Sequence, residues 1–351
     1  MQSKSVVQYL DSLRALATIG VILIHISSPL VNMTWSKNMP YWWVGNVADS
    51  LVRFAVPVFL MLSGATMLGK EYSLTDFYKK RFLRVFLPFV FWLLMYWIYR
   101  WAMLKPASRP VDVGGIADWA MNLFLKEGVS KHLWYIYMIL FIYMILPFLG
   151  ILIRKLSNNA LLVLLLGWVI LTFVFRSTPM NLYSWTGDYG SKFLGWFLHV
   201  GYVVLGFYLS RVTWKEVKIK PIAGIVFILT VLVSTVGTYC LSVGGKRPDL
   251  TLYSYLNLNT IIQSTALFVW LKNTEISSKF VLKLQNTISN YSYGIYLVHI
   301  MVIGILFRNG IYWSFAHPLV SLPLLVTGVT VISFGIIFLL RKIPGGKYVA
   351  G

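Results

Sequence analysis

Two ionisable residues in the first apolar stretch of the sequence, Arg14 and His25, are the residues best placed to do chemistry. In an α-helix, eleven steps of ~100° return to within roughly 20° of the starting direction, so both side chains lie on one face, about 16 Å apart along the axis. Polar groups at membrane depth are costly and usually face a protein interior or a water-filled cavity. A neutral imidazole can act there as a general base. The alternative, a histidine that only bonds to a neighbouring helix, is less favoured because Arg14 shares its face.

The next apolar stretch also carries polar residues. Asp49 and Arg53 are four residues apart and could pair on one helical face. Pro57 removes a backbone hydrogen bond and predicts a kink. The small residues Ser63 and Gly64 permit close approach of another backbone or of a ligand. A functional site and a structural ion pair with a tight helix contact remain equally open here.

A basic cluster, KKRFLRVFLP, follows at residues 79–88. Arg81 and Arg84 are three residues apart at the start of a predicted helix and would project together. Arginine side chains match the geometry of phosphate oxygens, so a nucleotide-like or lipid phosphate could dock there. Topology determination and contact with lipid headgroups are the simpler interpretation of the cluster taken alone.

Two later stretches combine histidine with aromatic residues. His132 and Trp134 stand where an apolar stretch begins, either as an interfacial anchor or as a platform for a sugar ring, whose apolar face suits aromatic side chains. Ser292, Tyr296 and His299 follow one another at i, i+4 and i+7, and such a polar stripe needs partners inside the protein. Hydrogen bonds between helices would also satisfy this stripe.

The composition indicates an all-α, polytopic membrane protein. Of 351 residues, 58% are hydrophobic and 12% are charged, and the mean hydropathy is +0.72, which excludes an ordinary soluble globular protein. No separate soluble segment is evident, so residues 1–351 are expected to form a single integral-membrane domain. We expect a bundle of about ten membrane-spanning helices, each of roughly 17–25 residues. They are predicted at residues 12–31, 45–68, 83–103, 132–153, 160–177, 192–210, 221–242, 252–271, 288–307 and 319–340.

The net charge of +20 arises from short cationic clusters between apolar stretches. Cytoplasmic loops and anionic lipid headgroups explain this pattern better than nucleic-acid binding does. Lys and Arg are more numerous on the side that contains both termini, so both termini are predicted to be cytoplasmic. The single cysteine, Cys240, excludes an intramolecular disulfide. Five histidines without a close pair, together with scattered acidic residues, argue against a metal site.

Five motifs in a fixed order carry a family resemblance. They are LDSLRALATIGVILIH, AVPVFLMLSG, KRFLRVFLP, HLWY and NYSYGIYLVH. In order and spacing the chain resembles the acyltransferase 3 family of bacterial membrane O-acyltransferases, and in its short form it is similar to members that acetylate surface-polysaccharide sugars. Ala15 and Ala65 depart from residues common in that family, which weakens assignment to a subfamily but leaves the chemistry intact.

The resemblance implies a function and roles for the candidate residues. It implies a multi-pass enzyme of the bacterial inner membrane that uses acyl-CoA, commonly acetyl-CoA, as a co-substrate, binds no permanent cofactor, and acylates a hydroxyl of an extracytoplasmic or lipid-linked glycan. His25 would deprotonate that hydroxyl, although a covalent acyl-histidine is not excluded. Arg14, Arg81 and Arg84 would hold the CoA phosphates. The remaining candidates are Ser63, Tyr296 and His299 for the thioester or its oxyanion, and His132, Trp134, Arg53, Tyr296 and His299 for the acceptor.

Other functions remain open at this point. A transporter or flippase of a glycan precursor would also use a helical bundle with buried polar groups, although such proteins usually show broken helices in two related halves. A regulatory membrane module that resembles an inactive acyltransferase would not need Arg14 and His25 together. A homo-oligomer is also compatible with the sequence.

Overall fold

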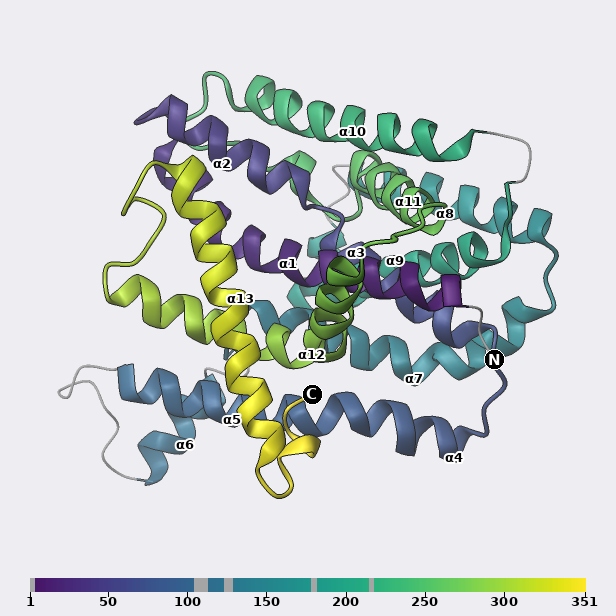
Figure 1. Ribbon diagram of the computed structural model, residues 1–351, viewed down its shortest axis with the longest axis horizontal. Helices are drawn as coiled ribbons and strands as arrows, with labels where there is room; N and C mark the ends of the chain where they lie inside the picture. The colour runs from purple at the N-terminus through teal and green to yellow at the C-terminus, as the bar shows by residue number, and fades with distance from the viewer. Residues whose placement is uncertain (1–3, 104–112, 123–128, 178–181, 215–217) are drawn as a thin grey trace.

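The computed structural model describes residues 4–103, 113–122, 129–177, 182–214 and 218–351, and these residues form helices joined by short connections (Figure 1). No strand occurs in these ranges. The α-helices are α1 (Lys4–Thr34), α2 (Met39–Leu51), α3 (Ala55–Ser63), α4 (Leu74–Phe77), α5 (Leu83–Met103), α6 (Val113–Asn122), α7 (Trp134–Arg154), α8 (Asn158–Ser177), α9 (Leu182–Arg211), α10 (Ile219–Ser242), α11 (Leu258–Lys272), α12 (Lys279–Arg308) and α13 (Pro318–Lys342). Two π-helical turns, Gly64–Leu68 and Tyr78–Phe82, follow α3 and α4.

The predicted all-α, polytopic bundle is confirmed. Within the described ranges, eight helical stretches are long and apolar enough to cross a membrane. Two predicted spans, at residues 192–210 and 252–271, fall on α9 and α11, which are not among these eight. The reason is clear for α11, because a 3-10 turn at Thr251–Tyr253 delays its start and leaves 15 residues. That length spans only about 22 Å of a ~30 Å hydrocarbon core. The cytoplasmic location of both termini remains a prediction.

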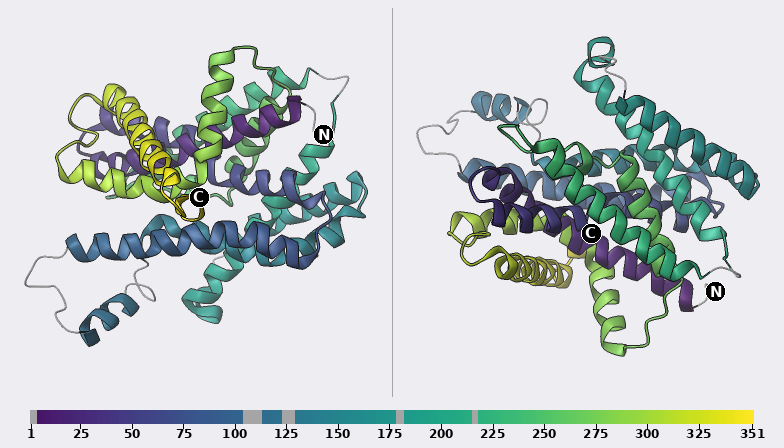
Figure 2. Two further views of the ribbon diagram at one scale, coloured as in Figure 1. Left: turned by 60° about the horizontal axis from the view of Figure 1, so that its bottom comes forward. Right: turned by 90° about the horizontal axis from the view of Figure 1, so that it is seen from above.

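Helix α1 occupies the interior of the bundle (Figures 1 and 2). It contacts α2, α3, α11, α12 and α13, and its apolar side chains Leu13, Ile22 and Ile26 are almost fully buried. Because the helix continues from Lys4 to Thr34, Arg14 and His25 belong to one helix as predicted. The packing therefore holds both residues among protein side chains.

The second apolar stretch is broken one turn before Pro57, the proline that predicted a kink. Helix α2 ends at Leu51, residues 52–54 form a turn, and α3 begins at Ala55. A proline leaves the carbonyl four residues earlier, here that of Arg53, without its helical hydrogen bond, so the predicted kink is confirmed. Pro57 lies in the first turn of α3, where backbone amides have no partner within the helix and a proline costs little.

Two glycines allow the backbone at the end of α3 to contact the backbone of α9 directly. A Cβ atom at Gly64 would lie 1.8 Å from the carbonyl oxygen of Val203, and one at Gly206 would lie 2.0 Å from that of Met61. The predicted close approach at Gly64 is thus confirmed. It fixes the position of Ser63, the residue before Gly64, relative to α9.

We predict that Gly64→Ala and Gly206→Ala each lower the free energy of unfolding by about 1–3 kcal/mol, because the added methyl group forces the two backbones apart. Thermal unfolding of the detergent-purified variants measures this effect. Gly167→Ala on α8 is the control, because a Cβ atom there meets nothing within 4 Å. The control should be neutral or stabilising by up to ~1 kcal/mol. Equal stability of all three variants would contradict the backbone contact.

Candidate functional site

A cavity of about 340 Å³ opens between α1, α3, α5, α7 and α12. A cavity of this size lies within the usual range for small-molecule sites. Six residues singled out from the sequence line it, although they come from four separate parts of the chain. They are Arg14, Ser63, Arg81, Arg84, Tyr296 and, in the same stripe as Tyr296, Ser292.

Arg14 is held in the cavity wall by two neighbours that the sequence analysis did not single out. Its Nη1 donates to Asp11 Oδ1 over 3.2 Å and to Ser289 Oγ over 2.9 Å. The Ser289 hydroxyl donates in turn to Asp11 Oδ1 over 2.6 Å. Nη2 and Nε of Arg14 have no partner among the described residues, so these donors remain for a ligand. The sequence signal for Asp11 was its position three residues before Arg14, on the same helical face.

Arg81 and Arg84 make the cavity electropositive. Arg81 belongs to the π-helical turn Tyr78–Phe82 and Arg84 to the first turn of α5. Arg84 is close enough to Arg14 for their charges to interact, and all three arginines interact electrostatically with the cavity residue Tyr143. The described residues that line the cavity include these three cations and no carboxylate side chain. Such a site favours an anionic ligand.

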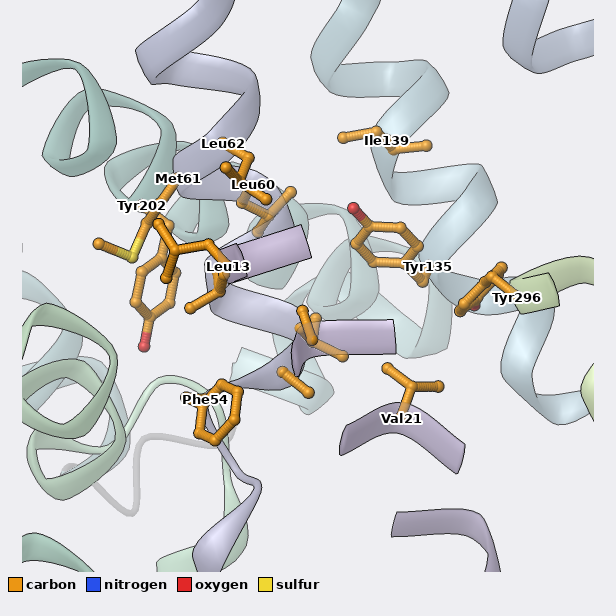
Figure 3. Close-up of a cluster of buried hydrophobic side chains, with 14 of the residues drawn as sticks. Leu13, Val21, Phe54, Leu60, Met61, Leu62, Tyr135, Ile139, Tyr202 and Tyr296 are labelled. Carbon is orange, nitrogen blue, oxygen red and sulfur yellow. The ribbon is translucent and has the colours of Figure 1, made fainter. Parts of the chain in front are cut away.

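Aromatic side chains close the inner end of the cavity. The rings of Tyr135 and Tyr296 lie 5.5 Å apart between centroids, and both side chains line the cavity. Figure 3 shows them side by side, with Val21 of α1 nearby. The Tyr296 hydroxyl donates to the backbone carbonyl of His132 over 2.5 Å.

Three histidines meet beyond this aromatic layer. Ring centroids are 5.2 Å apart for His25 and His299, 5.3 Å for His132 and His299, and 6.4 Å for His25 and His132. They come from α1, from the 3-10 turn that precedes α7, and from α12. The sequence analysis missed this cluster because its members are more than 100 residues apart in the chain. His132 and His299 are buried, whereas part of the His25 surface is accessible.

Two buried imidazole nitrogens in this cluster have no hydrogen-bond partner among the described residues. His299 Nδ1 lies 2.6 Å from the carbonyl oxygen of Tyr296, which can only accept, so Nδ1 carries the proton and Nε2 is a free acceptor. His132 Nδ1 lies 2.9 Å from Ser130 Oγ, and its Nε2 is also unpaired. Unpaired buried polar atoms are uncommon, so both nitrogens indicate a place for a hydroxyl-bearing ligand or water; His132 Nε2 serves as donor or acceptor according to which of its ring nitrogens carries the proton. In the described ranges, no group of three His, Cys, Asp or Glu side chains is arranged to hold a metal ion.

His25 does not line the cavity. Tyr296 lies between the cavity and the histidine cluster. Its ring lines the cavity, and its ring centroid is also 5.6 Å from those of both His132 and His299. One layer of side chains therefore stands between the arginine-lined cavity and the histidine cluster.

Arg53 and Trp134 lie outside the cavity. Arg53 forms an ion pair with Asp49, and its guanidinium lies 4.2 Å from the ring centroid of Tyr253. It is also close enough to His25 to act on it electrostatically. Trp134 stacks on Tyr255, with the ring centroids 6.0 Å apart. Both residues have internal partners, and their roles toward an acceptor remain predictions.

Comparison with known proteins gives one family. The family model described as an acyltransferase domain matches residues 7–342, which include the cavity arginines and all three clustered histidines. The chain is similar to YfiQ of Bacillus subtilis (strain 168), to which a membrane-bound acyltransferase function is ascribed. The two are 25% identical over 327 residues, which cover 83% of this chain and 80% of YfiQ. No solved structure matches the chain significantly. The chain therefore belongs to the acyltransferase 3 family and is a multi-pass membrane acyltransferase.

Proposed function

We propose that this protein is an O-acyltransferase of the bacterial inner membrane. It transfers an acyl group, most simply acetyl, from cytoplasmic acyl-CoA to a hydroxyl of a cell-surface or lipid-linked glycan. One observation supports this proposal above the others. A single cavity presents Arg14, Arg81 and Arg84 and ends one side-chain layer away from His25 and its two neighbouring histidines.

The arginine end of the cavity suits the phosphates of coenzyme A. Charge-assisted bonds from guanidinium to phosphate are strong and directional. Arg14 and His25 are about 16 Å apart along α1, a distance that an extended pantetheine arm can span. Ser63 also lines the cavity, and its proposed role is to position the thioester. Acyl-CoA is thus a co-substrate, and no permanently bound cofactor is needed.

The histidine cluster suits the acceptor. His25 takes the proton of the acceptor hydroxyl as its oxygen attacks the thioester carbonyl, a step that general-base catalysis speeds by about 10²–10⁴-fold. The free Nε2 of His299 accepts a hydrogen bond from an acceptor hydroxyl, and the unpaired Nε2 of His132 makes a second contact with the acceptor. Tyr296, Trp134 and Arg53 complete the acceptor side of the site.

We predict that purified wild-type protein transfers radiolabelled acetyl from acetyl-CoA to membrane glycans, and that His25→Ala and Arg14→Ala each reduce transfer at least about 100-fold. Alkali lability of the label identifies an O-ester. His317→Asn and Arg247→Ala, which change exposed residues distant in sequence from both motifs, are the matched controls and should retain activity. Equal labelling by His25→Ala would remove His25 as the base. Absence of transfer from every acyl-CoA tested would overturn the proposal and favour a transporter.

A second prediction concerns the support of Arg14. Asp11→Asn should raise KM for acetyl-CoA about tenfold with little change in kcat, because Arg14 loses its charged partner and its fixed direction. Ser289→Ala should have a smaller effect of the same kind, because the carboxylate remains. Steady-state kinetics with varied acetyl-CoA measure both effects. An unchanged KM, or a loss confined to kcat, would show that Asp11 does not act through donor binding.

A further inference from the structure

Four tyrosines line the cavity together with Thr66, Asn290 and Ser292, and the tyrosine hydroxyl groups are neutral donors available to a bound thioester. The four tyrosines are Tyr135, Tyr143, Tyr293 and Tyr296. Acyl transfer places negative charge on the carbonyl oxygen in the transition state, and a preorganised donor for that oxygen usually supplies a large share of catalysis. It matters, therefore, which of these hydroxyls still has its proton to donate.

Three of the four hydroxyls are already engaged. Tyr296 donates to the carbonyl of His132 over 2.5 Å, and Tyr293 donates to the carbonyl of Val85 over 2.7 Å. The Tyr143 hydroxyl lies 3.5 Å from Ser63 Oγ. None of these three can serve a substrate without giving up a contact within the protein.

The other donors expected from the sequence are engaged as well. Ser63 Oγ donates to the carbonyl of Phe59 over 3.2 Å. The Nδ1 proton of His299 is directed at the carbonyl of Tyr296. Of the three side chains predicted to stabilise an oxyanion, Ser63, Tyr296 and His299, each therefore already donates to a backbone carbonyl.

Tyr135 differs from all of these residues. Its hydroxyl has no hydrogen-bond partner within the described part of the chain, although its side chain is buried and lines the cavity. Its ring is held by an edge contact with Tyr296 and a tilted contact with Phe59, at centroid distances of 5.5 and 6.2 Å. In Figure 3 the hydroxyl points away from Tyr296. A rigid ring on the cavity wall with a free hydroxyl donor is suited to an oxyanion site.

We propose that the Tyr135 hydroxyl is the oxyanion donor of this acyltransferase. This inference rests on the proposed function. The acceptor oxygen forms a bond to the thioester carbon as its proton passes to His25, and Tyr135 donates a hydrogen bond to the resulting oxyanion. The intermediate then collapses, the carbon–sulfur bond breaks, and the proton passes from His25 to the departing thiolate. The products are free CoA thiol and the acyl ester, and Tyr135 keeps its own proton throughout.

Tyr135→Phe tests this inference because it removes the hydroxyl and keeps the ring contacts. We expect kcat for acetyl transfer to fall about 10²–10³-fold while KM for acetyl-CoA changes less than about threefold. Tyr9→Phe is the matched control, because Tyr9 is a buried tyrosine that packs on Phe268 outside the cavity. The control should retain wild-type kinetics. A Tyr135→Phe enzyme with unchanged kcat, or with only a raised KM, would overturn the inference.

A spectroscopic measurement separates the hydrogen bond from any general effect on folding. Acetyl-CoA labelled with ¹³C at the thioester carbonyl is bound to the His25→Ala protein, which blocks turnover, and its infrared carbonyl stretch is recorded. We expect the stretch at a lower wavenumber than in solution, and a return toward the solution value when Tyr135→Phe is added. An identical stretch in both proteins would refute the contact.

The two proposals fail in different ways. Transfer by the wild type together with equal transfer by Tyr135→Phe would leave the acyltransferase function intact and remove only the role of Tyr135. No transfer by the wild type from any acyl-CoA would remove the proposed function itself.

Discussion

The structure depends on shielding one charged helix from lipid. Helix α1 carries Asp11, Arg14 and His25, and an Asp or Arg at the centre of a bilayer costs at least ~2.5–3.5 kcal/mol. Five other helices contact α1, so these side chains meet protein instead of hydrocarbon. Ser289 on α12 accepts a hydrogen bond from Arg14 and donates one to Asp11, so these polar groups are hydrogen-bonded where the two helices touch. The enclosure of α1 therefore produces a polar interior within an otherwise apolar bundle.

Tyr296 organises that interior. Its hydroxyl donates to the backbone of His132, its carbonyl accepts from His299, and its ring forms part of the cavity wall. One residue thus holds two histidines and also separates them from the arginines. A change at Tyr296 would alter both regions together, whereas changes at Ser63 or Arg84 affect the cavity alone.

The sequence predicted the features that depend on local pattern. Hydropathy and segment length predicted the helical membrane bundle, helical periodicity predicted the shared helix of Arg14 and His25, and residue size predicted the close approach at Gly64. Features that depend on tertiary packing were missed. The three-histidine cluster joins distant segments, and no spacing rule reveals such a contact. The break before α3 at residues 52–54, by contrast, was predicted, because it lies one turn before Pro57. The hydrogen-bond partners of the cavity tyrosine hydroxyls lie in other segments of the chain, and the order of residues in the sequence does not identify them.

The separation of the two polar regions suits transfer between substrates that arrive from different sides. Water that reached a thioester would compete with the acceptor, and excluding it also strengthens electrostatic interactions at the reacting atoms. Under the proposed function, the reacting groups of donor and acceptor meet at the side-chain layer that contains Tyr135 and Tyr296. His25 is the clustered histidine with accessible surface, whereas His132 and His299 are buried around it. In this proposal the acceptor reaches His25 at its accessible surface, and the unpaired Nε2 atoms of the two buried histidines contact acceptor hydroxyls.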